Sequence, residues 1–280
     1  LLALLLWIAV ARALKPLVAL THEVESREPE NLAALDTSSA PHEVKPLIER
    51  LNRLFGRIGA SLQKERRFTA DAAHELRTPI AAIKAQAQVA RASSTEAERK
   101  HALDNAILGC DRASHLITQL LTLARVDTLD NSARESCRIG EIAAEMIAAL
   151  APAAITKGVQ LELLAGTEFT VNGNPELLRV LLRNLLDNAM QHTPGGTTVQ
   201  VKISQEDGAY CLSVSDNGPG IAEDERNKVL ERFYRPLGTQ ASGSGLGLSI
   251  VKRIAEVHNA SLQILPGENG GLLVRVCFKP

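Results

Sequence analysis

The chain has 280 residues, of which 45% are hydrophobic and 22% are charged. This composition supports packed cores in about two domains of ~150 residues each, and it excludes a chain that is disordered throughout. The 31 basic and 32 acidic side chains give a net charge of −1. That balance argues against a dedicated nucleic-acid-binding protein, because such proteins carry a basic excess.

The first segment, residues 1–11, is an uncharged apolar run that is followed by Arg12 and Lys15. It is shorter than the ~20 residues that cross a bilayer. Two interpretations remain open: the cytoplasmic half of a transmembrane helix with the two cations on its inner flank, or a buried helix. We favour the first, because the segment that follows is too polar to bury such a helix. This first interpretation places a partial transmembrane helix at residues 1–14, and it places the chain from about residue 12 onward in the cytoplasm.

Residues 15–66 are expected to form two helices around the polar segment 36–42. The second helix carries apolar residues at every third or fourth position, namely Leu47, Leu51, Leu54, Ile58 and Leu62. This spacing predicts a narrow stripe of the coiled-coil type. A short helical pair after a membrane segment resembles a HAMP-type signal relay.

The second helix is expected to continue to residue 92 and to end before Ser93 and Ser94. Thr95 and Glu98 then have the spacing of a capping box for the next helix. That helix has its own stripe at Leu103, Ile107, Cys110, Ser114, Ile117 and Leu121. Two antiparallel helices with one stripe each cannot bury both stripes alone, so residues 67–130 are predicted to form a four-helix bundle in a homodimer.

From residue 137 to 280 the pattern becomes that of an α+β domain. Helices are expected over 140–157, 175–191 and 248–258, and strands over 159–164, 169–171, 199–204, 210–216, 261–266 and 272–278. The helices should cover one face of a largely antiparallel sheet. The long glycine-rich segment 217–247 has the length of a functional loop. The fold class is therefore multi-domain, an all-α helical hairpin followed by an α+β sandwich.

The cysteines are widely spaced in the sequence, and no two form a C-x-x-C pair; they are Cys110, Cys137, Cys211 and Cys277. This spacing favours neither a disulfide framework nor a zinc site. We therefore predict free thiols in a reducing compartment.

His74 is the first candidate for chemistry. Glu75 can accept a hydrogen bond from its Nδ1–H, which leaves Nε2 as a nucleophile. Thr78 follows one helical turn later on the same face, and Pro79 removes an amide donor just beyond it. The pattern is similar to the H-E-x-x-H helix of zinc proteases, but Thr78 stands where the second histidine is needed, so we set that class aside.

The segment 74–80, HELRTPI, resembles the H box of sensor histidine kinases. Later segments resemble the other boxes of this family in the same order: the N box at 184–193, the G1 box at 216–221, the F box at 231–235 and the G2 box at 243–248. The resemblance extends from about residue 15 to the end and is strongest to the QseC-type branch. It implies that residues 137–280 form an ATP-binding domain of the histidine kinase, gyrase and Hsp90 type.

This resemblance also implies site residues. Asn188 would ligate Mg²⁺, which prefers oxygen ligands, while Asn184 and His192 on the same helix face would lie near the phosphates of ATP. Asp216 would accept a hydrogen bond from the adenine amino group. Phe233 would either anchor a lid or only pack. The remaining nucleotide-binding positions that the resemblance implies are Gly218, Gly220, Ile221, Gly243, Gly245, Leu246, Gly247 and Leu248.

The reaction follows from the same resemblance. Gyrase and Hsp90-like ATPases have a water-activating Glu where this chain has Asn184, and Asn cannot act as a general base. We therefore expect a membrane-bound, dimeric bacterial kinase of the inner membrane that transfers the γ-phosphoryl group of ATP to His74, with Glu75 orienting the imidazole. The group would pass to an Asp on the receiver domain of a response regulator, and Thr78 would position water in a phosphatase reaction. A nucleotide-binding scaffold and a gyrase-like ATPase are the alternatives.

Overall fold

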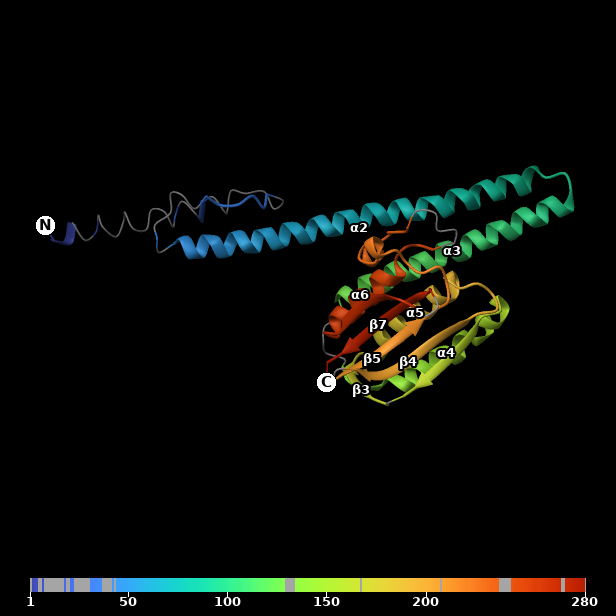
Figure 1. Cartoon of the computed structure of the whole chain (residues 1–280). Coiled ribbons are helices and arrows are strands. Elements are labelled where there is room, and N and C mark those ends of the chain that lie inside the picture. Colours follow the sequence, from blue (N-terminus) through green and yellow to red (C-terminus); the bar gives the residue numbers. More distant parts are fainter. Residues whose placement is uncertain are drawn as a thin grey trace. The chain divides into compact units, whose positions relative to one another are not determined.

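The computed structural model describes residues 2–4, 7, 18, 21–22, 31–36, 42, 44–128, 134–166, 168–206, 208–236, 243–267 and 270–279. The predicted membrane helix at 1–14 and the first relay helix fall mostly outside these residues. The chain divides into two compact units, Leu1–Asp71 and Ala72–Pro280, and each is described by itself. Figure 1 labels the elements.

In the first unit, the long helix α2 (Lys45–Ala92) begins and runs on without interruption, as the apolar spacing predicts. The extended segment before it is held by Asn52, whose side chain accepts from Leu35 N (2.7 Å) and donates to Leu35 O (3.0 Å). Leu35 is buried as a result. The stripe residues Leu47, Leu54, Ile58 and Leu62 are exposed in the single chain, so this apolar surface is open to a partner helix.

The second unit starts with the remainder of α2 and with α3 (Glu96–Thr128). One of the two hydrogen bonds of the predicted capping box is confirmed, because Thr95 Oγ1 accepts from Glu98 N at 3.3 Å. A Cβ placed on Gly109 of α3 would lie 2.7 Å from Ile83 Cγ1 of α2, so glycine permits this close helix approach. The α3 stripe stays exposed at Leu103, Ile107, Cys110, Ser114, Ile117 and Leu121. The dimeric bundle that would bury it remains a prediction.

The α+β region contains two sheets. The larger has the strand order β2 (Gln160–Ala165), β4 (Thr198–Glu206), β5 (Ala209–Ser215), β7 (Leu272–Phe278) and β6 (Ser261–Pro266). Only β2–β4 is a parallel pair, so the largely antiparallel sheet is confirmed. The smaller sheet pairs β3 (Thr170–Gly173) with β1 (Glu135–Arg138), a strand that the sequence analysis did not predict.

Three helices supply the other layer of this region (Figure 1): α4 (Ile139–Lys157), α5 (Pro175–His192) and α6 (Gly247–Val257). Alternate residues of the central strands are buried beneath them, among them Val201, Leu212, Val214 and Val276. Each such side chain contributes about 1.5–3 kcal/mol on burial. Among the described residues, α4 alone is long and apolar enough to cross a membrane by length and composition, but α4 packs against β2 and α5.

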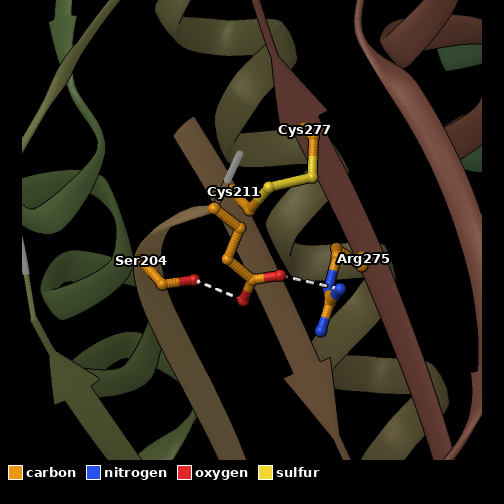
Figure 2. The surroundings of a disulfide bond; sticks show 5 residues. Ser204, Cys211, Arg275 and Cys277 are labelled. Atoms are coloured by element: carbon orange, nitrogen blue, oxygen red, sulfur yellow. Dashed lines mark hydrogen bonds and ion pairs between the residues drawn. A yellow bond between two sulfur atoms is a disulfide. The ribbon is translucent and has the colours of Figure 1, made fainter. Parts of the chain in front are cut away.

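The prediction of free thiols is wrong for two of the four cysteines. Cys211 and Cys277 form a disulfide, with an S–S distance of 2.00 Å and a sequence separation of 66 (Figure 2). Strand pairing places them opposite each other on β5 and β7, a long-range register that sequence spacing does not reveal. Cys110 and Cys137 are free.

Candidate nucleotide site

Helix α5 carries the first set of predicted site residues. It begins at Pro175 after Asn174, whose side chain accepts from Glu176 N (3.0 Å) and Leu177 N (3.2 Å) as a helix cap. Its apolar side fixes the rotation of the helix, because these residues are fully buried: Leu178, Leu182, Leu185 and Ala189. Asn184, Asn188 and His192 are spaced by four on an adjacent side of the helix, and all three line a cavity.

That cavity has a volume of about 1160 Å³ and lies within the second unit. Several of the sequence-predicted site residues line it: Glu75, Thr78, Asn184, Asn188, His192, Asp216, Gly220, Ile221, Gly243, Gly245, Gly247 and Leu248. Four predicted residues do not line it, namely His74, Gly218, Phe233 and Leu246. His74 is exposed on α2, next to the cavity-lining Glu75. One connected space thus joins the neighbours of His74 to the α5 face and the glycine-rich loops.

Asp216 is held rigidly at the end of β5. Its backbone N–H donates to Leu272 O (2.9 Å), and its Oδ1 accepts from Gly218 N (2.8 Å) and Leu272 N (3.2 Å). Burial raises the pKa of the Asp216 carboxyl, and the hydrogen bonds from Gly218 and Leu272 partly offset this. Gly218 does not line the cavity itself, but its N–H therefore helps to fix the orientation of the cavity-lining Asp216 side chain.

Gly271 and Leu272 complete the support of Asp216, and neither was predicted from the sequence as a site residue. A Cβ on Gly271 would lie 1.8 Å from Asp216 O, so no larger residue fits without a backbone shift. Gly220, with a φ of 69°, would likewise meet Gly270 O at 2.8 Å. The glycine pair 270–271 was visible only as a turn signal, because nothing in the sequence connects it to a residue 55 positions earlier.

His192 is half-buried at the C-terminal end of α5. Burial lowers the pKa of its imidazole, the nearby cations Arg235 and Lys157 lower it further, and Asp216 opposes them. The ring is therefore neutral at pH 7. Lys157 and Arg235 also line the cavity and bring positive charge to it, although sequence reasoning did not select them.

The F box and G2 box are joined through their backbones. Phe233 has a φ of 63°, and its N–H donates to Gly245 O at 3.0 Å. A Cβ on Gly245 would lie 2.7 Å from the carbonyl carbon of Phe233. Leu246 is fully buried at the start of α6, and its N–H donates to Ser244 Oγ at 3.2 Å. Phe233 and Leu246 therefore shape the loop from behind, outside the cavity wall.

The donor set suits a hard cation that shares phosphate oxygens. Asn188 lines the cavity, and the side chain of Asn184 donates from Nδ2 to Val180 O at 2.8 Å, which fixes its amide. Within the described part of the chain, no group of three or more His, Cys, Asp or Glu residues forms a metal cage. Mg²⁺ is commonly bound by one or two protein oxygens together with phosphates, and the amide oxygen of Asn188 fits that pattern.

Three family models match successive parts of the chain. They are a PhoQ-like HAMP domain at residues 14–60, a His Kinase A (phospho-acceptor) domain at 64–129, and a histidine kinase-, DNA gyrase B- and HSP90-like ATPase at 173–280. Among curated proteins, the sensor protein QseC of Escherichia coli K12 is 40% identical over an alignment of 283 positions, which covers 98% of this chain and 61% of that protein. The sensor protein BasS of E. coli K12 is 34% identical, with 90% of this chain and 68% of the relative covered.

A solved structure with the same fold is the histidine kinase AdeS of Acinetobacter baumannii. It matches with a TM-score of 0.57 and 22% identity, and covers 74% of this chain and 97% of that one. The chain spans about three fifths of the length of the QseC relatives that it matches.

Proposed function

Because this chain belongs to the sensor histidine kinase family, we propose that it binds ATP with Mg²⁺ and phosphorylates its own His74. One observation carries the proposal: Asn188 and Asp216 line the same cavity as Glu75 and Thr78, which follow His74 within the next turn of α2. Phosphoryl transfer depends mainly on the positioning of the two reacting groups and on the neutralisation of phosphate charge. A cavity shared by the two sets of residues provides the positioning.

The binding roles follow from the contacts. Asp216 is tied by Oδ1 to two backbone donors, so Oδ2 is the oxygen that accepts from the adenine amino group. Asn188 supplies an amide oxygen to Mg²⁺, which when bound neutralises charge on the phosphates. Asn184, the amides around Gly243–Gly247, and the cations Lys157 and Arg235 surround the phosphates.

In the transfer step, His74 attacks the γ-phosphorus through Nε2, and the bond to the β-phosphate oxygen breaks so that ADP leaves. Glu75 takes the imidazole proton from Nδ1. Asn184 cannot deprotonate a water molecule in competition, which directs the phosphoryl group to the imidazole.

The same assignment extends to partners and location. We assign residues 1–14 to a transmembrane segment, 15–66 to the signal relay, 67–130 to the dimeric phosphotransfer bundle and 137–280 to the ATP-binding domain. The protein would act as a homodimer at the bacterial inner membrane. It would pass the phosphoryl group to an Asp of a response-regulator receiver domain. In the opposing phosphatase reaction, Thr78 would position the water molecule that hydrolyses this phospho-Asp.

Incubation with γ-labelled ATP and Mg²⁺ tests the proposal. We expect acid-labile, base-stable label on the wild-type chain and none on His74→Gln, with His101→Gln as a matched control at an exposed histidine of α3. A wild-type chain that binds ATP but stays unlabelled would favour the scaffold. Rapid phosphate release without protein label would favour a gyrase-like ATPase.

A further inference from the structure

The disulfide lies on the face of the sheet that the helices do not cover. Cys211 of β5 stands directly opposite Cys277 of β7, and Ser204 of β4 stands opposite Cys211 on the other side. The neighbouring positions Leu212 and Val276 point to the buried helical side, so strand alternation places both cysteines on the outer face. Figure 2 shows Ser204, Cys211, Arg275 and Cys277 grouped there.

The two sulfur-bearing residues differ in access. Cys211 is 1% exposed, whereas Cys277 is only half-buried. A carboxylate bridge lies beside them: Glu206 accepts from Ser204 Oγ at 3.0 Å and pairs with Arg275 at 2.8 Å (Figure 2). Cys277 is therefore the more accessible residue of the pair for a thiol that arrives from solvent.

The rung next to the disulfide carries positive charge. Lys202, Ser213 and Arg275 lie opposite one another on β4, β5 and β7, on the same outer face as the cysteines. Neighbouring cations favour thiolate over thiol, which eases the departure of a cysteine sulfur from a disulfide. Among the described residues, the buried Ser213 Oγ and Arg275 Nε have no hydrogen-bond partner. Both groups are hydrogen-bond donors. A thiolate is a good acceptor for such donors, whereas a disulfide is a poor acceptor.

We propose that Cys211–Cys277 is a reversible thiol–disulfide exchange site for low-molecular-weight thiols, entered at Cys277. In the reducing direction, a thiolate of the small thiol bonds to Cys277 Sγ, the protein S–S bond breaks, and Cys211 leaves as a thiolate that takes up a proton. A second small thiolate attacks the sulfur of the bound small thiol and releases Cys277. The protein gains two electrons and two protons, and the small thiol leaves as its own disulfide.

The exchange site is linked to the cavity through one strand pair. Beyond the cysteines the β5–β7 ladder continues to Ser215 opposite Leu273, and then to the mutual backbone and side-chain bonds of Asp216 and Leu272. The disulfide cross-links the two strands that hold Asp216. Reduction removes that cross-link, so amides of β5 and β7 should open more often.

The test uses the full chain with Cys110→Ser and Cys137→Ser, so that only the pair reacts. Native protein is equilibrated in buffers of reduced and oxidised glutathione, and thiols are counted by alkylation and mass spectrometry. We expect conversion between zero and two free thiols without denaturant, in both directions. In single variants, Cys211→Ser should form a mixed disulfide at Cys277, and Cys277→Ser should react at least about tenfold more slowly at the buried Cys211. Deuterium exchange in β5 and β7 should be faster in the reduced form.

Three results would overturn the proposal: a pair that stays oxidised in excess reduced glutathione, a pair that stays reduced in excess oxidised glutathione, or equal reactivity of the two single variants. Unchanged deuterium exchange would refute the link to Asp216. The exchange needs neither ATP nor His74, so its failure would leave the proposed kinase activity untouched, and failure of labelling at His74 would leave the exchange site standing.

Discussion

The substitution Asp216→Asn changes the cavity by one atom and tests how the nucleotide base is chosen. Oδ1 accepts from Gly218 N and Leu272 N, so the oxygen of the new amide must take this place, since its NH₂ group would face two donors there. The NH₂ group is thereby forced into the position of Oδ2. A hydrogen-bond acceptor in the proposed adenine pocket becomes a donor.

The expected loss of ATP affinity combines two effects. A hydrogen bond to a charged group, worth about 1.5–3 kcal/mol, disappears, and the adenine amino group is left against a donor at a further cost of about 1–3 kcal/mol. Together these costs, about 2.5–6 kcal/mol, predict a rise in Kd of roughly 60- to 20,000-fold. The fold should tolerate the change within about 1 kcal/mol, because the bonds to Oδ1 persist and burial, which raises the pKa of Asp216, disfavours the charge that the substitution removes.

Calorimetric titration with ATP and with inosine triphosphate measures this effect, since a 6-oxo purine presents an acceptor where adenine presents a donor. The variant should bind the 6-oxo nucleotide more tightly than ATP, which reverses the wild-type order. Asp224→Asn is the matched control at an exposed carboxylate outside the cavity, and urea unfolding checks stability. A folded variant with unchanged ATP affinity, or with equal loss for both nucleotides, would refute the assigned role of Asp216.

Three further predictions concern other parts of the second unit. Thr78→Ala should retain autophosphorylation but lose phosphatase activity toward a phosphorylated response regulator, and an equal loss of both in labelling assays would contradict the division of roles. Burial lowers the pKa of His258, whose Nδ1 donates to Ile254 O (2.8 Å), so the unfolded chain binds a proton that the folded chain rejects. The free energy of unfolding should therefore fall as pH drops below the ordinary value of about 6.5, and His258→Gln should flatten this dependence in urea titrations; an unchanged slope would exclude His258 as a source. Gly271→Ala should cost at least about 2 kcal/mol of unfolding free energy, because its Cβ would lie 1.8 Å from Asp216 O, and an unchanged melting curve would show that the loop yields freely.

Local pattern was sufficient for most elements of this fold. Apolar spacing predicted α2, α3 and α5 to within a few residues, and alternation predicted β4 and β5. The helices α4 and α6 and four more of the seven strands were also expected from the sequence. The strand β1 was missed because its four residues, ESCR, have neither length nor apolar alternation and become a strand only by pairing with β3. Short edge strands depend on a partner that sequence periodicity does not name.

The candidate site likewise contains residues whose place was predictable from local pattern and residues whose place was not. The residues of α5 were predictable because a helix fixes which positions share a face, so Asn184, Asn188 and His192 had to point together. Phe233 and Leu246 were expected among the nucleotide-binding residues, yet they support the loop from outside the cavity.

Sequence alone therefore determined the order of domains, the helical faces and the family motifs, since each depends on residues close together in the chain. Tertiary structure decided which distant segments meet: Gly271 against Asp216, Lys157 beside His192, and Cys211 opposite Cys277. These contacts arise from strand register and loop packing across long separations, where many pairings are compatible with the same local pattern and only the assembled core selects one.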